Sequence, residues 1–287
     1  MRARGRFLPH GRIGPAALTA IVAALALAAL VAAYVGVVLF VWLVQDRMMF
    51  YPRPAVGARV APAGWRLETV RPTMADGTVL SGLLLLPPGP PAPLVVYFGG
   101  NAEEVTELAA DAERTWGRRA VLLVNYRGYG ASAGVPSEAS FVADGVALVD
   151  AFSRRPDAQG SRVALHGRSL GTGVAVQVAT LRPPQCVVLT SPFASARDIA
   201  REAFPWLPIR WLMRHPFDSL ARAASNHVPL LVLAGDSDTL IASHHSRRLA
   251  QAWGGPAAFS LVHGGHNDLQ DDPRYGAALA TFLDAHL

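Results

Sequence analysis

The sequence predicts an α/β fold in which a mainly parallel, doubly wound sheet follows one transmembrane helix. Apolar runs of strand length alternate with segments of helical periodicity from about residue 94 onward. A long uncharged segment near the N-terminus precedes them. Such alternation is typical of a parallel sheet covered by helices on both faces. The 287-residue chain is long enough for one domain of this kind beyond the N-terminal segment.

The N-terminal segment is predicted to be a transmembrane signal anchor at residues 16–44, after a basic tail at residues 1–15. Ala16 to Val44 contains no charged residue, and a helix needs about 20 apolar residues to cross a bilayer. A cleaved signal peptide is the alternative, because arginines precede an alanine-rich run. The apolar core of a signal peptide spans only about 7 to 15 residues, which favours an uncleaved, single-pass anchor.

Basic residues around the span set the expected orientation. The tail contains four arginines: Arg2, Arg4, Arg6 and Arg12. Because basic residues concentrate on the cytoplasmic side, the tail favours a cytoplasmic N-terminus and a folded domain outside the cytoplasm. The opposite flank also carries arginines, which weaken this inference: Arg47, Arg53 and Arg59.

The rest of the chain is close to electrically neutral, since the tail holds four of the five net positive charges. A nucleic-acid-binding domain needs basic residues concentrated on one face, so we expect no nucleic acid partner. The chain contains no lysine. Enzymes that use a lysine Schiff base, a Ser-Lys pair or a P-loop lysine are therefore excluded.

Residues 45–64 are interpreted as a Pro-rich linker and residues 65–287 as the folded domain. Arg66 to Arg71 and Val79 to Leu86 are predicted to form an antiparallel pair around the Asp76-Gly77 turn. Strands and helices then alternate. The next predicted strands are Leu94 to Phe98, Val121 to Asn125, and the runs at Val163 and Val187. The predicted helices start near Glu103, near Ser137 and directly behind Ser169.

A serine between two glycines, Ser169, interrupts the third of these apolar runs. Residues 163–173 read VALHGRSLGTG, which has the Gly-x-Ser-x-Gly form of a nucleophile elbow. Gly167 and Gly171 remove side chains that would collide at such a strained strand-to-helix turn. Ser169 is the candidate nucleophile, and the Leu170 N–H at the helix start is a candidate oxyanion donor. Glycine-rich turns are common between strands and helices, so the partners of Ser169 decide the interpretation.

A serine nucleophile needs a base and a carboxylate that orients the base. On a sheet of this type they follow in the order Ser, Asp, His. One later predicted strand is followed by Asp236 and Asp238, and the next is followed by His263 and His266. We expect Asp238 and His266 to act, because Asp238 lies farther into its loop and two glycines let His266 fold back toward Ser169. Asp236 and His263 are the alternatives.

The second oxyanion donor is expected after the strand that ends at Phe98. Gly99 and Gly100 follow the strand and would let the backbone approach a tetrahedral intermediate closely. The Asn101 N–H is our candidate donor. Gly-Gly-Asn is also an ordinary turn, in which Asn101 would cap the helix predicted near Glu103.

Four segments extend the pattern beyond these residues: NYRGYGASAG from Asn125, GRSLGTG from Gly167, SPFASARD from Ser191 and HPFDSL from His215. They resemble a membrane-anchored branch of the α/β-hydrolase superfamily that includes depalmitoylating α/β-hydrolase-domain proteins and bacterial serine aminopeptidase-like hydrolases. QDRMMFYPRP also resembles the linker of that branch. The resemblance covers about residues 45–287 and implies an α/β-hydrolase fold with Ser169, Asp238 and His266 as the triad. One departure is Gly99, where the branch usually has histidine.

Residues 194–227 are predicted to form a small helical cap over the elbow. The stretch FPWLPIRWLMRHPFD places apolar and aromatic side chains among prolines that break helices. One interpretation is a lid that lines an acyl pocket and touches the bilayer. The other is a short helix packed on the core, since apolar residues at helical spacing usually face a core.

Neither a cofactor nor a metal is expected. The lone cysteine, Cys186, lies in an apolar strand and is interpreted as core packing. His244 and His245 are adjacent and lack the three- or four-residue spacing with which a helix presents two ligands on one face.

The sequence thus predicts a membrane-anchored serine hydrolase that cleaves an acyl ester or thioester through an acyl-enzyme intermediate. Its expected partners are the membrane and a small apolar or lipid-like acyl substrate. The alternatives are an amidase or peptidase, a cofactor-free haloperoxidase on the same triad, and a non-catalytic membrane protein that serves as a binding or scaffold module.

Overall fold

The computed structural model describes residues 14–55 and 57–287. The chain divides into two compact units, Met1–Gln45 and Asp46–Leu287. The basic tail predicted at residues 1–15 lies outside the described residues except for Gly14 and Pro15.

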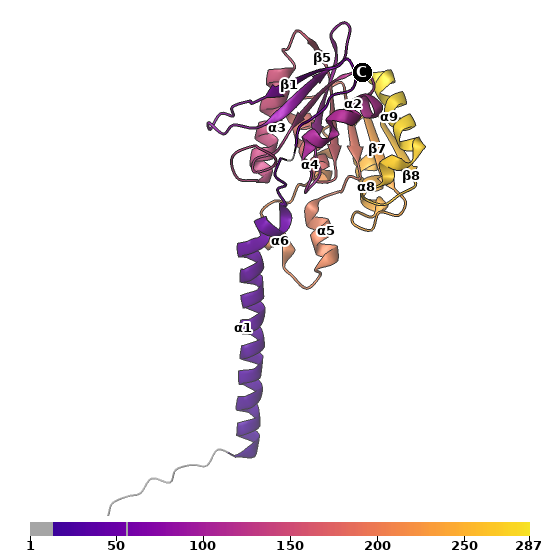
Figure 1. Cartoon of the computed structure of the whole chain (residues 1–287). Helices are drawn as coiled ribbons and strands as arrows, with labels where there is room; N and C mark the ends of the chain where they lie inside the picture. The colour runs from indigo at the N-terminus through magenta and orange to yellow at the C-terminus, as the bar shows by residue number, and fades with distance from the viewer. Residues whose placement is uncertain (1–13, 56) are drawn as a thin grey trace, which may run out of the picture. The chain divides into compact units, whose positions relative to one another are not determined.

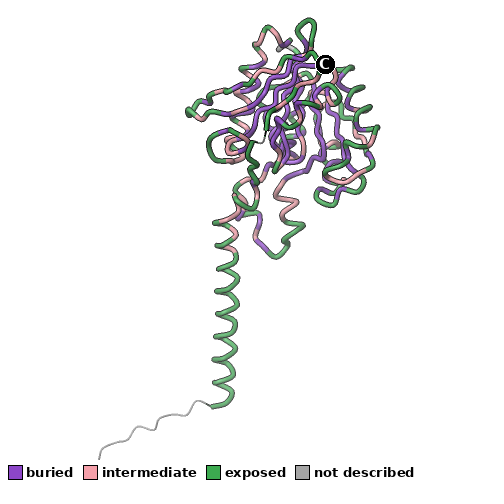
Figure 2. The backbone as a smooth tube through the Cα atoms, viewed as in Figure 1, coloured by how far each residue is buried: buried purple, intermediate pink, exposed green. Residues whose placement is uncertain are grey.

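Helix α1 spans Pro15–Met49. Its residues up to Gln45 belong to the first unit, and the residues from Asp46 onward belong to the second. Among the described residues, α1 is the one helix that is long and apolar enough to cross a membrane. Figure 2 shows it exposed along nearly its whole length. The helix continues past the predicted end at Val44 and includes the charged residues Asp46 and Arg47.

The second unit is built on an eight-stranded sheet with the order β1-β2-β4-β3-β5-β6-β7-β8 (Figure 1). The strands are β1 Arg66–Val70, β2 Gly82–Leu86, β3 Ala92–Phe98, β4 Ala120–Val124, β5 Ala158–Arg168, β6 Cys186–Thr190, β7 Leu230–Gly235 and β8 Ala257–Val262. Strand β2 is antiparallel to β1 and β4, and the strands from β4 to β8 are parallel. The predicted α/β class and antiparallel opening pair are confirmed.

Helices cover both faces of the sheet because successive strand residues point to opposite faces. They are α2 Ala112–Trp116, α3 Glu138–Phe152, α4 Leu170–Leu181, α5 Ala196–Ala203, α6 Ile209–Leu212, α7 Leu220–Ala223, α8 Ser243–Ala252 and α9 Pro273–His286, with 3-10 helices η1 Val105–Asp111 and η2 Leu269–Asp271. In β3, Leu94 and Val96 pack in one apolar cluster with α3 and α4. Val95 between them packs in the other cluster, with α2 and α9. The two clusters form one core layer on each side of the sheet.

The helix predicted to start near Glu103 is wrong in position and type. The chain forms 3-10 helix η1 from Val105 and reaches α-helical geometry only in α2. Asn101 is therefore not a helix cap, and Glu104 takes the position before η1 without a side-chain cap bond. Tertiary contacts explain the difference, because the Asn101 carboxamide bonds to residues before the sheet, whereas the Glu104 carboxylate accepts from Asn125.

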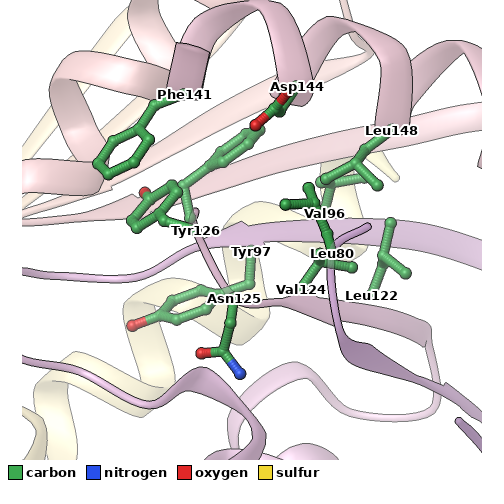
Figure 3. A pocket seen from close by; sticks show the side chains of 12 residues that line it. Leu80, Val96, Tyr97, Leu122, Val124, Asn125, Tyr126, Phe141, Asp144 and Leu148 are labelled. Carbon is green, nitrogen blue, oxygen red and sulfur yellow. The ribbon is translucent and has the colours of Figure 1, made fainter. Parts of the chain in front are cut away.

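A small cavity lies between α3 and the sheet (Figure 3). Its volume is about 10 Å³, which is room for about one water molecule. Tyr126, Phe141 and Asp144 line it together with apolar side chains of β3 and β4. The cavity is therefore too small to hold an acyl chain.

Candidate active site

Ser169 lies at a sharp turn between β5 and α4. Its backbone has φ 49° and ψ −117°, a conformation that costs a non-glycine residue about 1 to 3 kcal/mol. The turn is held from both sides, since the Ser169 N–H donates to the Thr190 carbonyl at 2.9 Å and the Thr172 hydroxyl donates to the Ser169 carbonyl at 2.6 Å. The surrounding strands thus fix the strained backbone that presents the Ser169 hydroxyl.

The two glycines flanking the turn are required by close backbone contacts. A Cβ at Gly167 would collide with the backbone of Gly171 across the turn. A Cβ at Gly171 would collide with the carbonyl oxygens of Phe98 and Gly99. Glycine is needed at position 167 because of the turn itself, as the sequence predicted. Glycine is needed at position 171 for a different reason, because the end of β3 passes directly against the start of α4.

Gly171→Ala is expected to destabilise the protein by about 3 kcal/mol, because the new methyl group meets backbone atoms that cannot rotate away. The matched control is Gly276→Ala in α9, where an added Cβ meets nothing within 4 Å. Alanine there is expected to raise stability by up to about 1 kcal/mol. Thermal unfolding of both variants in detergent measures the difference, and equal melting temperatures would contradict this account of Gly171.

Three side chains form a continuous hydrogen-bonded chain at the turn. The His266 Nε2 lies 2.8 Å from the Ser169 Oγ, and the His266 Nδ1 lies 2.8 Å from Asp238 Oδ2. The other oxygen of Asp238 accepts from the Leu240 N–H at 2.9 Å and the Ile241 N–H at 2.8 Å. The Asp238 and His266 side chains are only 1% and 11% exposed. The structure therefore brings together the three residues of the predicted triad.

Asp238 stays ionised despite its burial. Burial by itself raises the pKa of Asp238, but the hydrogen bonds from His266 and from two backbone N–H groups hold that pKa below its ordinary value. A carboxylate that is charged at neutral pH fixes the ring orientation of its histidine and stabilises the imidazolium that forms during proton transfer.

The two alternative residues, Asp236 and His263, pair with each other and lie outside the hydrogen-bonded triad. His263 Nδ1 lies 3.2 Å from Asp236 Oδ2, with the side chains 78% and 40% exposed. Asp236 also accepts from the Gly264 N–H at 3.2 Å and the Ser237 hydroxyl at 2.8 Å. Within the part of the chain that the structure describes, neither residue bonds to Ser169. Asp236 therefore connects the turn after β7 to the loop after β8.

Leu170, directly after Ser169, and the loop after β3 supply the backbone N–H groups that could bind an oxyanion. In the described residues, no hydrogen bond occupies the N–H of Leu170 or of Asn101. The Gly100 N–H, by contrast, donates to the Glu103 carboxylate at 2.6 Å. A Cβ built on Gly100 would lie 3.5 Å from the Ser169 Cβ, which places this loop against the nucleophile. Leu170 and Asn101 remain the candidate donors.

An ion pair not anticipated from the sequence joins the loops around the site. Arg168 Nη1 donates to Glu103 at 3.2 Å, and Arg168 Nη2 donates to the His266 carbonyl at 3.1 Å and to Asn267 Oδ1 at 3.0 Å. Burial lowers the pKa of Arg168, but the Glu103 carboxylate outweighs it and the pKa is raised. Arg168 thereby ties the loop after β3 to the loop that carries the histidine. In the sequence, the one sign of this ion pair was the charged residue Arg168 inside the elbow motif.

His244 and His245 lie next to each other in space as well as in sequence. They occupy the first turn of α8, with ring centroids 4.1 Å apart, and both Nε2 atoms approach the Glu202 carboxylate. Ligand atoms of the three residues lie within 4.8 Å of one another. The histidines help to lower the pKa of Glu202, against the opposing effect of burial. The cluster links α5 to α8 through the contacts of both imidazole rings with the Glu202 carboxylate.

Cys186 is completely buried at the start of β6. Burial raises the pKa of its thiol to about 12. A thiol that stays protonated at neutral pH is a poor nucleophile, which fits a packing role.

The segment predicted as a cap, residues 194–227, contains α5, α6 and α7. Part of its apolar surface packs inward: Leu207, Ile209, Leu212 and Phe217 are buried. Three aromatic side chains remain in solvent, with Phe204 42%, Trp206 56% and Trp211 82% exposed. A cavity of about 490 Å³ opens between α5, α6 and α8 and is lined by arginines as well as apolar residues. The buried residues agree with a segment packed on the core, and the lid over an acyl pocket stays a prediction.

Residues 89–221 match the family model described as serine aminopeptidase, S33. An uncharacterized protein of Mycobacterium tuberculosis is 39% identical over 249 residues, which cover 85% of this chain and 87% of the relative. An α/β-hydrolase domain-containing protein of Arabidopsis thaliana is 30% identical, covering 45% of this chain and 47% of the relative. An uncharacterized membrane protein of Saccharomyces cerevisiae is 29% identical, with 57% and 60% covered.

Two solved esterase structures share the fold. An esterase from Pyrococcus furiosus superposes with a TM-score of 0.66 at 19% identity, covering 83% of this chain and 98% of the esterase. An acetyl xylan esterase from Paenibacillus sp. R4 gives a TM-score of 0.66 at 20% identity, with 87% and 94% covered.

Proposed function

Because the chain belongs to the α/β-hydrolase family of hydrolytic enzymes, we propose that it is a membrane-anchored serine hydrolase that cleaves acyl esters or thioesters. The observation that carries this proposal is the hydrogen-bonded chain from the Ser169 hydroxyl through His266 to Asp238. A serine on a strained turn, bonded to a histidine that a buried carboxylate orients, is the arrangement that activates a hydroxyl for attack on a carbonyl.

In the proposed reaction, the Ser169 Oγ attacks the carbonyl carbon while His266 Nε2 takes the hydroxyl proton. The N–H groups of Leu170 and Asn101 stabilise the negative oxygen of the tetrahedral intermediate. Collapse of the intermediate expels the alcohol or thiol, which receives the proton from His266. Water then attacks the acyl-enzyme with His266 as base, which releases the carboxylic acid and restores the Ser169 hydroxyl.

We propose an apolar or lipid-like acyl group as the substrate, on the basis of the aromatic side chains exposed on the cap segment. A peptidase is the second candidate, because the matching family model is described as serine aminopeptidase. The test compares p-nitrophenyl esters of increasing chain length with an acyl thioester and an aminoacyl amide, using full-length protein in detergent. Faster turnover of the longer esters or the thioester supports the proposal. Preference for the amide would favour the peptidase.

We also propose that α1 anchors the protein in the membrane and that the hydrolase domain lies outside the cytoplasm. Full-length protein is expected in the membrane fraction after carbonate extraction, because the uncharged run is long enough to span a bilayer. Soluble protein lacking its N-terminal residues would show a cleaved signal peptide instead. Val135 is 77% exposed, so a Val135→Cys variant is expected to react with an impermeant maleimide on intact cells. Labelling only after lysis would place the domain in the cytoplasm.

A further inference from the structure

The Asn101 side chain is bound by the segment that leads out of the anchor, residues 49–54. Its Nδ2 donates to the Met49 carbonyl at 2.6 Å, and its Oδ1 accepts from the Tyr51 N–H at 3.0 Å. The Tyr129 hydroxyl donates to the same Oδ1 at 2.8 Å and also accepts from the Tyr51 N–H at 3.1 Å. Asn101 is thus held by backbone groups of Met49 and Tyr51, which lie 52 and 50 positions earlier in the chain.

These bonds hold a loop with unusual backbone geometry. Ala102, directly after Asn101, has φ 56°, which only glycine adopts freely. The Ala102 N–H also donates to Asn101 Oδ1, at 3.1 Å. The carboxamide therefore bonds on both its oxygen and its nitrogen, and one of its bonds supports the strained residue. A loop in this conformation persists only where its surroundings fix it.

The segment that holds Asn101 is itself fixed to the domain. The Phe50 side chain is buried and packs edge-on against Phe141, with ring centroids 5.4 Å apart. At the other end, the Gly130 N–H donates to the Arg53 carbonyl at 2.7 Å, and Pro54 forms a parallel bridge with Gly130. Residues 49–54 are thus anchored on both sides of the point where they meet Asn101.

We propose that residues 49–54 support the active site through Asn101 and that the Asn101 side chain is a positioning residue, which aims the Asn101 backbone N–H at the oxyanion. The inference rests on the proposed serine hydrolase function and adds a link from residues 49–54 to the chemistry. Misplacing a catalytic group by about 1 Å lowers the rate by about a hundredfold. The side chain acts through the backbone of its own residue, so its loss leaves the N–H present but wrongly directed.

The test is Asn101→Ala in the full-length protein in detergent. We expect kcat for a p-nitrophenyl ester to fall by about a hundredfold while KM changes less than about threefold, because the oxyanion forms only in the transition state. The affinity for a trifluoromethyl ketone, which adds Ser169 to form a tetrahedral oxyanion, should fall in proportion to kcat. The matched control is Asn226→Ala, which removes a buried carboxamide that bonds to Thr180 and Arg222 outside the site. It should keep normal kcat.

A second variant keeps the test informative if Asn101→Ala does not fold. Tyr129→Phe removes one bond to the carboxamide but leaves those from Tyr51 and Ala102, so kcat should fall by about three- to tenfold with KM unchanged. Wild-type kcat and ketone affinity in a folded variant at position 101 would overturn the inference while leaving the serine mechanism intact. An inactive wild-type protein that no ketone inhibits would instead remove the proposed function itself.

Discussion

Ser169→Ala in the full-length protein is expected to remove nearly all ester hydrolysis, lowering kcat by up to about a millionfold. His266→Ala should cause a loss of similar size, because a serine without its base is rarely deprotonated at neutral pH. The double variant should be hardly worse than either single one, since the two side chains perform one proton transfer and act as a unit. Steady-state kinetics on a p-nitrophenyl ester measures all three.

Two controls separate this chemistry from general damage. Ser219 is fully buried, and among the described residues its hydroxyl has no hydrogen-bond partner, so Ser219→Ala should leave kcat unchanged. His263→Ala should also cost little, because that side chain is exposed and pairs with Asp236. Substantial turnover by folded Ser169→Ala would contradict the mechanism. Equal losses at His263 and His266 would overturn the choice of base.

Asp238→Asn is expected to lower kcat by about ten-thousandfold with the fold intact, because an amide leaves histidine in the wrong tautomer for accepting the serine proton. Asn keeps the shape and an acceptor for the Leu240 and Ile241 N–H groups. Asp236→Asn is the matched control, a change of the same kind two residues away. It should keep near-normal kcat, since within the described residues the Asp236 side chain bonds to Ser237, His263 and Gly264 and not to His266.

The two acids would exchange roles if Asp236→Asn were inactive and Asp238→Asn hydrolysed esters at a near-normal rate. Circular dichroism and thermal unfolding of both variants establish that each is folded before the rates are compared. Equal and complete loss in both would point to damage in the loop after β7 rather than to an orienting carboxylate.

The layered fold was predictable because it depends on local patterns. The apolar runs at β3 to β7 are bounded by turn residues, and α3 begins at Glu138, close to the start predicted near Ser137. The segment after Asn101 was not predictable in this way. The Asn101 side chain bonds to Met49 and Tyr51, and the Val105 N–H donates to Asn125 Oδ1. These distant contacts replace the local helix start that the pattern favoured.

The candidate site was likewise predictable only in part. Loop position alone favoured Asp238 and His266, and the hydrogen bonds of the structure agree with that choice, while their roles in chemistry stay predictions. The Arg168–Glu103 pair and the contacts of Asn101 required the folded chain. Each joins loops that the sheet topology brings together, and no spacing within one segment of the sequence indicates them.

The most direct test of the account is to locate the adduct that a fluorophosphonate forms with the full-length protein. The reagent phosphonylates an activated serine, and mass spectrometry of the digested protein identifies the modified residue. We expect one adduct per chain, on the peptide that contains Ser169, and none in His266→Ala over the same time. An adduct on another serine, or no adduct in protein that hydrolyses esters, would contradict it.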